Sequence, residues 1–438
     1  ERGVTAYERL IAQVGNSATG DLGYWLDVSR VAGGKMRDDS FHTQMKDLKL
    51  NIQLPEPAKG SIAGPIDYGR IVLDDGRLDG YPEKGFYWYP DGFGYGFLGS
   101  PRQAEMASNV RVVLTNPGYA SNLKAAVVAD LCAAPERQII VANGPQTLNS
   151  PSVPYILRRD SGDGLSVFAK LVRVVDSPDA DPIASFVEVP VASAPGSRAW
   201  CVTWTDGRKD LWIVGDGANV ASVAAASLPE VSTDARVALI RFDSLGKAVA
   251  VSATETSAVK ISGGHTVRSP RVVTGRVEAV DPADAPVVLK VSWDAGTADF
   301  VRKGLPLVTI PSGGQPVVWE IDSASTNQIR LADLKSVMAA TDFEPVSGKP
   351  GWYRMLTAVS RFYATTGRSN RAYALGKPVY EGKECIGRIA DIADDAHSIK
   401  IESNGKPVQV KETFSGRILE TGPGDWFRIP LTVNWRSN

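Results

Sequence analysis

The sequence predicts an all-β protein, with a large antiparallel β-sandwich over residues 1–255 and a smaller C-terminal β domain over residues 256–438. Apolar residues mostly alternate with polar ones or form short runs rich in β-branched side chains, which is typical of strands. Asp-Gly and Asn-Gly pairs recur between these runs and favour tight hairpin turns. Helical spacing is scarce: residues 331–340 are the best helix candidate, and residues 5–14 fit a short helix or a first strand.

The first strand of clear character covers residues 23–32. Trp25 and Asp27 lie on one of its faces and Leu26 on the other, because side chains alternate along a strand. The pair Gly33-Gly34 then supplies a turn, since glycine readily adopts positive φ. We therefore expect a hairpin here, with a second strand that leads to His42.

Two further strand pairs stand out. Residues 200–204 and 210–214 flank Asp206-Gly207 and form the clearest hairpin of the chain. Residues 272–281 and 287–293 are expected to pair as the first strands of the second domain.

Composition excludes several classes of protein. A net charge of −1 argues against a nucleic-acid binder, which needs a basic face to neutralise phosphates. No apolar stretch is long enough to span a membrane as a helix. The three cysteines form no disulfide framework, so we expect Cys132 and Cys201 to be buried free thiols, with a single disulfide as the alternative in an exported protein.

No cofactor is predicted. The three histidines have no second histidine or cysteine at ligand spacing, and no phosphate loop or hydrolase nucleophile motif stands in a suitable context. A zinc or calcium ion stays open as an alternative, with a mixed site of His42 and a distant carboxylate such as Asp27 or Asp39 as its strongest form.

Aromatic residues are concentrated in residues 81–98, where they lie among glycines. Tyr87, Trp88 and Tyr89 are the candidate substrate-binding residues, because aromatic rings stack on the apolar faces of sugars. The alternative is a long loop that packs its aromatic side chains onto the sandwich.

Several segments together resemble the heparinase II/III-like polysaccharide lyases. Residues 24–34 (YWLDVSRVAGG), followed by SFH at residues 40–42, are similar to a family strand that precedes a Gly-Gly turn and a histidine. RQIIVANGP at residues 137–145, PYILRR at 154–159 and TGRVEAVD at 274–281 follow in the family's order. The similarity extends over roughly residues 7–310 and rests on the order of these motifs.

The resemblance implies a fold, an activity and partners. Members of the family join an α/α toroid to β-sandwich domains and cleave uronic-acid polysaccharides by β-elimination. The toroid's helical run and the family's His-rich segment have no counterpart in these residues, so we expect a toroid supplied by an upstream segment or by a separate helical subunit. An acidic polysaccharide is the expected partner, and the expected location is extracellular, periplasmic or at the cell surface.

His42 is the candidate catalytic residue. In β-elimination it would accept a proton or neutralise the uronate carboxylate, and the alternative is a structural histidine. Arg37 is the candidate cation for the substrate carboxylate. The competing function is that of a non-catalytic carbohydrate-binding or cell-surface structural protein that keeps the sandwich without the chemistry.

Overall fold

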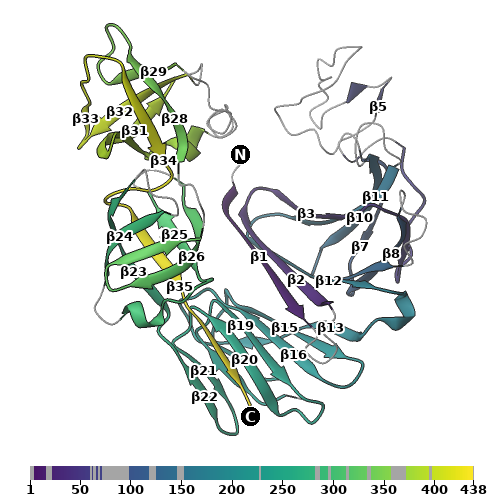
Figure 1. Ribbon diagram of the computed structural model, residues 1–438. Coiled ribbons are helices and arrows are strands. Elements are labelled where there is room, and N and C mark those ends of the chain that lie inside the picture. Colours follow the sequence, from purple (N-terminus) through teal and green to yellow (C-terminus); the bar gives the residue numbers. More distant parts are fainter. Residues whose placement is uncertain are drawn as a thin grey trace. The chain divides into compact units, whose positions relative to one another are not determined.

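The protein is all-β, as predicted (Figure 1). Among the described residues, the helical elements are two short 3-10 turns, η2 (Pro178–Ala180) and η3 (Thr297–Phe300), and one helical turn, α2 (Arg371–Ala374). None of the described helices is long and apolar enough to cross a membrane. The computed structural model describes residues 4–15, 22–59, 62, 66–67, 70–71, 98–117, 125–145, 152–225, 228–281, 287–293, 297–311, 315–332, 337–356, 371–393 and 397–437.

The chain divides into two compact units. The first comprises Glu1–Val189, Trp200–Asp210 and Asp243–Leu245. The second comprises Pro190–Ala199, Leu211–Phe242 and Gly246–Asn438. The sequence-based domain boundary at residue 255 stays a prediction.

The first unit contains the predicted antiparallel sandwich. Its six-stranded sheet has the order β1 (Val4–Gly15), β2 (Leu22–Gly33), β12 (Leu165–Val175), β9 (Ala126–Leu131), β8 (Val110–Pro117), β4 (Met45–Leu50). Its four-stranded sheet has the order β3 (Met36–His42), β11 (Ser152–Ser161), β10 (Gln138–Pro145), β7 (Gly99–Glu105). The two short strands β5 (Ile66–Asp67) and β6 (Arg70–Ile71) pair with each other. Apolar side chains from both larger sheets, such as Val112 and Ile139, form one buried cluster between them.

The start of the chain confirms one alternative and corrects one expectation. Residues 5–14 are a strand, since they lie within β1. Gly33 and Gly34 form the predicted positive-φ turn, with φ of 77° and 76°. The expected hairpin across this turn is wrong, because both edges of β2 already pair with β1 and β12 and the chain therefore enters the other sheet as β3.

Two further sheets follow. The first has the order β13 (Ile183–Val189), β15 (Arg198–Trp204), β16 (Lys209–Val214), β19 (Val237–Phe242), β20 (Ala248–Thr254), β36 (Thr432–Arg436). It contains the predicted hairpin, β15 and β16, which turns at Gly207 with a φ of 87°. The second has the order β14 (Val191–Ala192), β17 (Ala221–Val223), β18 (Val231–Thr233), β21 (Ala258–Ile261), β22 (His265–Arg268).

The C-terminal part of the second unit contains a closed barrel and a seven-stranded sheet. The barrel has the order β23 (Val272–Val280), β24 (Val288–Trp293), β27 (Gln328–Leu331), β26 (Val317–Ser325), β25 (Pro306–Ile310), β35 (Trp426–Pro430). The pairing of β23 with β24 is the one predicted. The sheet has the order β29 (Trp352–Met355), β28 (Val337–Pro345), β34 (Phe414–Leu419), β30 (Pro378–Glu381), β31 (Glu384–Ile392), β32 (Ser398–Ser403), β33 (Lys406–Pro407).

The helix predicted over residues 331–340 is wrong. Leu331 ends β27 and Val337 begins β28, and residues 333–336 lie outside the described part of the chain. Ile329 and Leu331 are both fully buried in the barrel core, at the period of two that a strand requires. Burial in the barrel therefore outweighs the local helical spacing.

The cysteines follow the prediction. Cys132 and Cys201 are buried free thiols, and Cys385 is a partly buried free thiol. Burial raises the pKa of the Cys132 thiol to about 12, so this side chain stays protonated at neutral pH.

Gly275 in β23 allows the closest approach inside the barrel. It lies opposite Phe427 of β35, whose ring packs over it and makes an edge contact with Trp293 at 5.9 Å. A Cβ atom at this position would lie 2.5 Å from the Phe427 ring and 2.3 Å from the carbonyl oxygen of Ser292. The barrel is therefore closed around a position that accepts only glycine.

Gly275→Ala is expected to destabilise the protein by about 1–3 kcal/mol, because the added methyl group overlaps backbone as well as a ring. The measurement is urea unfolding followed by circular dichroism. Gly15→Ala is the control, since nothing lies within 4 Å of a Cβ at that position. Equal stability of the two variants would contradict the tight packing at Gly275.

Candidate functional site

Strand β3 presents two different faces. Arg37 and Asp39 are buried and point into the sandwich, whereas Ser40 and His42 are exposed. This separation follows from the alternation of side chains along a strand, which places residues at odd separations on opposite faces. His42 therefore lies on the outer face of the four-stranded sheet.

On that outer face, His42 stacks on Tyr155. The two residues are directly opposite each other in the antiparallel pairing of β3 with β11. Their ring centroids are 4.2 Å apart and their planes differ by 30°. The register of the two strands thus brings an imidazole and a phenol, two groups that can transfer protons, into contact.

Burial against the sheet shifts the two pKa values in opposite directions. Partial burial lowers the pKa of His42 below its ordinary value of 6.5, because the charged imidazolium loses part of its solvation there. It raises the pKa of Tyr155 above its ordinary value of 10.0, because the phenolate would be the charged form. At neutral pH the imidazole is therefore a proton acceptor and the phenol a proton donor.

The same outer face carries an ion pair. Arg159 donates from Nε to Oδ1 of Asp38 and from Nη2 to Oδ2, both at 2.8 Å. Asp38 and Arg159 lie opposite each other in the strand pairing, as His42 and Tyr155 do. This bidentate geometry neutralises the guanidinium within the protein.

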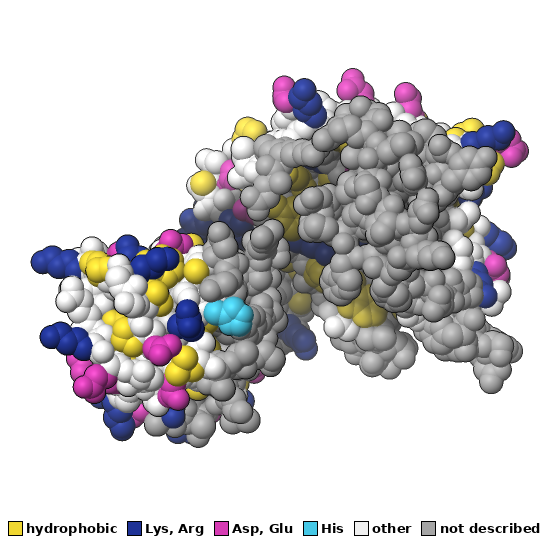
Figure 2. Space-filling model, turned by 90° about the horizontal axis from the view of Figure 1, so that it is seen from above, with side chains coloured by type: hydrophobic (Ala, Val, Ile, Leu, Met, Phe, Trp, Pro, Cys, Tyr) yellow, Lys and Arg dark blue, Asp and Glu magenta, His cyan; other side chains and the backbone are white. Residues whose placement is uncertain are grey.

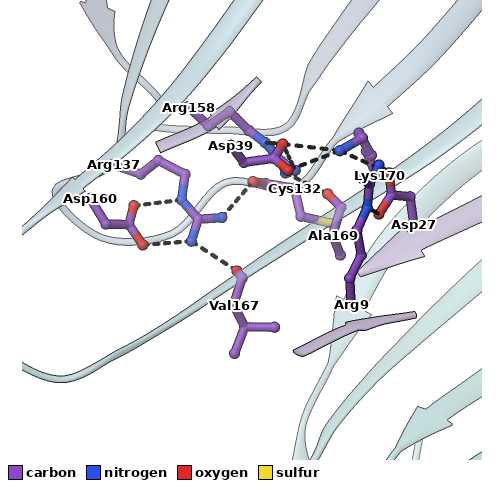
Figure 3. Close-up of polar contacts among 10 residues, drawn as sticks. All are labelled: Arg9, Asp27, Asp39, Cys132, Arg137, Arg158, Asp160, Val167, Ala169 and Lys170. Atoms are coloured by element: carbon purple, nitrogen blue, oxygen red, sulfur yellow. Dashed lines mark hydrogen bonds and ion pairs between the residues drawn. The ribbon is translucent and has the colours of Figure 1, made fainter. Parts of the chain in front are cut away.

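The inner face of β3 takes part in a buried network of charges (Figure 3). Lys170 of β12 lies between two carboxylates: its Nζ atom is 2.9 Å from Oδ1 of Asp39 and 3.0 Å from Oδ2 of Asp27. Arg158 of β11 also donates to Asp39, at 2.7 Å, and Arg9 of β1 donates to Asp27, at 2.7 Å. The network joins strands of both sheets of the sandwich.

These cations keep the two carboxylates ionised. Burial by itself raises the pKa of Asp39, but Arg158 and Lys170 more than offset that effect and hold the pKa below 3.8. The same balance applies to Asp27, where Arg9 and Lys170 are the opposing cations. Both side chains are at least nine-tenths buried, so these ion pairs are largely shielded from solvent.

A second ion pair, between the buried Arg137 and the partly buried Asp160, lies next to the first. Arg137 donates to both carboxylate oxygens of Asp160 at 2.8 Å, and to the backbone oxygens of Cys132 and Val167 (Figure 3). Its guanidinium also lies 4.4 Å from the centre of the Phe168 ring. All of these groups lie in the first unit and fix the strands that carry His42 and Tyr155.

The structure places the other candidate site residues apart from His42. Arg37 is buried on the inner side of β3 and donates to Oγ of Ser166 at 2.7 Å and to the backbone oxygens of Gly34 and Gly162. These contacts favour a structural role, and its contact with substrate stays a prediction. Tyr87, Trp88 and Tyr89 lie outside the described residues.

The metal-site alternative gains no support here. Among the described residues, no three His, Cys, Asp or Glu side chains are grouped to hold a metal ion. Asp27 and Asp39 share the Lys170 ammonium as their cation. His42 lies on the opposite face of β3 from Asp39, so β3 does not direct the two side chains to one site.

Sequence reasoning missed Tyr155 as a functional candidate. Its neighbours in the motif PYILRR indicate a strand, but nothing local to it indicates that His42 lies across from it. Comparison with known proteins adds no assignment: no protein-family model matches this chain, and no curated protein matches it.

Lys170→Met is expected to lower the free energy of unfolding by about 3–5 kcal/mol, because it leaves two buried carboxylates without their shared cation. Urea unfolding at neutral pH measures this. The control is Lys303→Met, which removes an exposed ion pair to Asp322 and should change stability little. A loss as small as that of the control would show that the ion pairs of Lys170 contribute little to stability.

Acid should destabilise the first unit through the same carboxylates. Their folded-state pKa values lie below 3.8, so their contribution is fully present above that value and is lost as the pH falls through the folded-state pKa. We expect the urea midpoint to decrease as the pH is lowered from about 7 to about 3. An Asp39→Asn variant should show a shallower decrease, and an unchanged slope would contradict the assignment.

Proposed function

We propose that this chain is the β-sandwich portion of a heparinase II/III-like polysaccharide lyase that acts by β-elimination on a uronic-acid-containing polysaccharide. An α/α catalytic part would come from an upstream segment or another chain. The stacking of His42 on Tyr155 at the outer face of the four-stranded sheet is the observation that carries the proposal. The order of family-like motifs along the sequence supports it.

The chemistry of β-elimination fits this pair of side chains. The reaction removes the C5 proton of a uronate, protonates the leaving O4 atom and needs the adjacent carboxylate to be neutralised. His42 would accept the C5 proton and Tyr155 would donate a proton to O4, in keeping with their opposite pKa shifts. C5 and O4 belong to neighbouring positions of one sugar ring, which suits two catalytic groups whose ring centres are 4.2 Å apart.

Neutralisation of the substrate carboxylate is not assigned to Arg37 or Arg159. Arg37 is enclosed by protein acceptors, and Arg159 is paired with Asp38. In this proposal, the missing charge stabilisation comes from the α/α part.

The internal pairing of Arg37 and Arg159 favours a second candidate, a non-catalytic carbohydrate-binding or cell-surface structural protein. Arginines that already bind acceptors of the protein are suited to holding strands together. Charge distribution supports either reading over a nucleic-acid partner: Figure 2 shows, in the described part of that view, lysine and arginine side chains interspersed with acidic ones. An extracellular, periplasmic or cell-surface location goes with both candidates.

The decisive experiment is an ultraviolet assay for the unsaturated product on alginate, hyaluronan, heparin and polygalacturonate. It is run with the chain alone and with any helical chain that co-purifies from the native source. His42→Ala and Tyr155→Phe should each lower the rate by about 10²–10⁴-fold, because each removes a proton-transfer group. His265→Ala is the matched control, since His265 also contacts an aromatic ring, that of Trp435, with 4.7 Å between the ring centroids.

Three outcomes are distinguishable. Product formation that His42→Ala abolishes and His265→Ala preserves supports the lyase. Product formation that is unchanged in both His42→Ala and Tyr155→Phe overturns the assigned roles. Polysaccharide binding without product in either preparation overturns the lyase and leaves the binding protein.

A further inference from the structure

The outer surface of the barrel carries an exposed tryptophan. Trp426 of β35 keeps 50% of its surface exposed, although its neighbour Phe427 is almost fully buried. Phe427 packs inward over Gly275, and the alternation along β35 therefore directs Trp426 outward. An indole held in this way on a closed barrel is a rigid apolar surface that faces solvent.

An arginine lies against this tryptophan. Arg276 of β23 is directly opposite Trp426 in the strand pairing, and its guanidinium carbon is 4.2 Å from the centre of the indole ring. Within the described part of the chain, Arg276 forms no ion pair, and the carboxylate of Glu278 on the same outer face accepts a hydrogen bond from Ser292 instead. It contrasts with Arg428, two residues along from Trp426, which is paired with Glu255.

The surface extends beyond this pair. Ile310 of β25 is opposite Trp426 on the other side, because β35 pairs with both β23 and β25, and it is 39% exposed. Val308 and Val318, which pair with each other on the same outer side, continue the apolar area. Because neighbouring strands are about 4.8 Å apart, the row from Arg276 through Trp426 to Ile310 is roughly 10 Å wide.

We propose that the Trp426–Arg276 surface of the barrel binds an acidic glycan, with a sugar ring stacked on Trp426 and a uronate carboxylate bound by Arg276. The apolar face of a sugar matches the exposed part of the indole that Arg276 does not cover, and the carboxylate matches the guanidinium, which forms no ion pair with a described residue and can bind a carboxylate through two parallel hydrogen bonds. Charge complementarity selects an acidic glycan over a neutral one. This site lies in the second unit and does not depend on the proton-transfer roles of His42 and Tyr155.

Binding of an alginate-derived hexauronate to the whole chain, measured by isothermal titration calorimetry, tests the proposal. Trp426→Ala and Arg276→Gln should each weaken binding by on the order of tenfold or more, and added salt should weaken the interaction of the parent protein. Arg330→Gln is the matched control: it changes an exposed arginine of the same barrel on β27, three strands away from β35 in the closed order. It should bind as tightly as the parent.

The other outcomes overturn the proposal. Unchanged affinity in both Trp426→Ala and Arg276→Gln places the glycan elsewhere. Equal affinity for neutral laminarihexaose removes the role of the carboxylate. Self-association that Trp426→Ala abolishes assigns the surface to a second copy of the chain. Hexauronate binding that Trp426→Ala weakens, in a preparation that forms no unsaturated product, separates failure of the lyase proposal from failure of this one, and thermal unfolding confirms that each variant is folded.

Discussion

The Lys170 ammonium, held between Asp27 and Asp39, is the interaction on which the sandwich depends. It joins a carboxylate of the six-stranded sheet to one of the four-stranded sheet, in an interior where each charge would be costly alone. Because Asp39 also binds Arg158 on the neighbouring strand, the network fixes the register of β3 against β11. That register in turn places His42 opposite Tyr155, so the outer pair depends on buried charges that it never touches.

Both proposed sites follow from the same geometric rule. On β3 the buried Asp39 and the exposed His42 occupy opposite faces, and on β35 the buried Phe427 and the exposed Trp426 do so as neighbours. In each case a contact of the inward residue, Asp39 or Phe427, fixes the position of the strand. The strand then directs the outward residue, His42 or Trp426, to the surface. A substitution at the outward position is therefore expected to change binding or catalysis with little effect on the packing of the core.

The sequence predicts the class of fold because alternation and Asp-Gly turns are local signals, as the hairpin of β15 and β16 illustrates. Prediction from the sequence fails where the pairing of strands that are distant in the chain determines the structure. Residues 331–340 have helical spacing, yet burial of Leu331 in the barrel makes that end a strand. In the sequence, Asp39 and Arg158 have the character of surface residues, and their burial becomes evident only when the two sheets are packed together. The pairing of His42 with Tyr155 is set by strand register, which no local pattern specifies.

The charges of the two units differ in a way that fits the two proposals, with proton transfer in the sandwich and anion binding on the barrel. In the sandwich, Arg158, Arg159 and Arg137 already bind carboxylates of the protein, so a polyanion would have to displace an internal partner before it gained one. On the barrel, Arg276 stacks on Trp426 and forms no ion pair with a described residue. An arginine that has no carboxylate partner within the protein contributes more binding free energy to an external anionic ligand. If the sandwich carries out the proposed proton transfers, affinity for an acidic glycan is therefore still expected from the barrel.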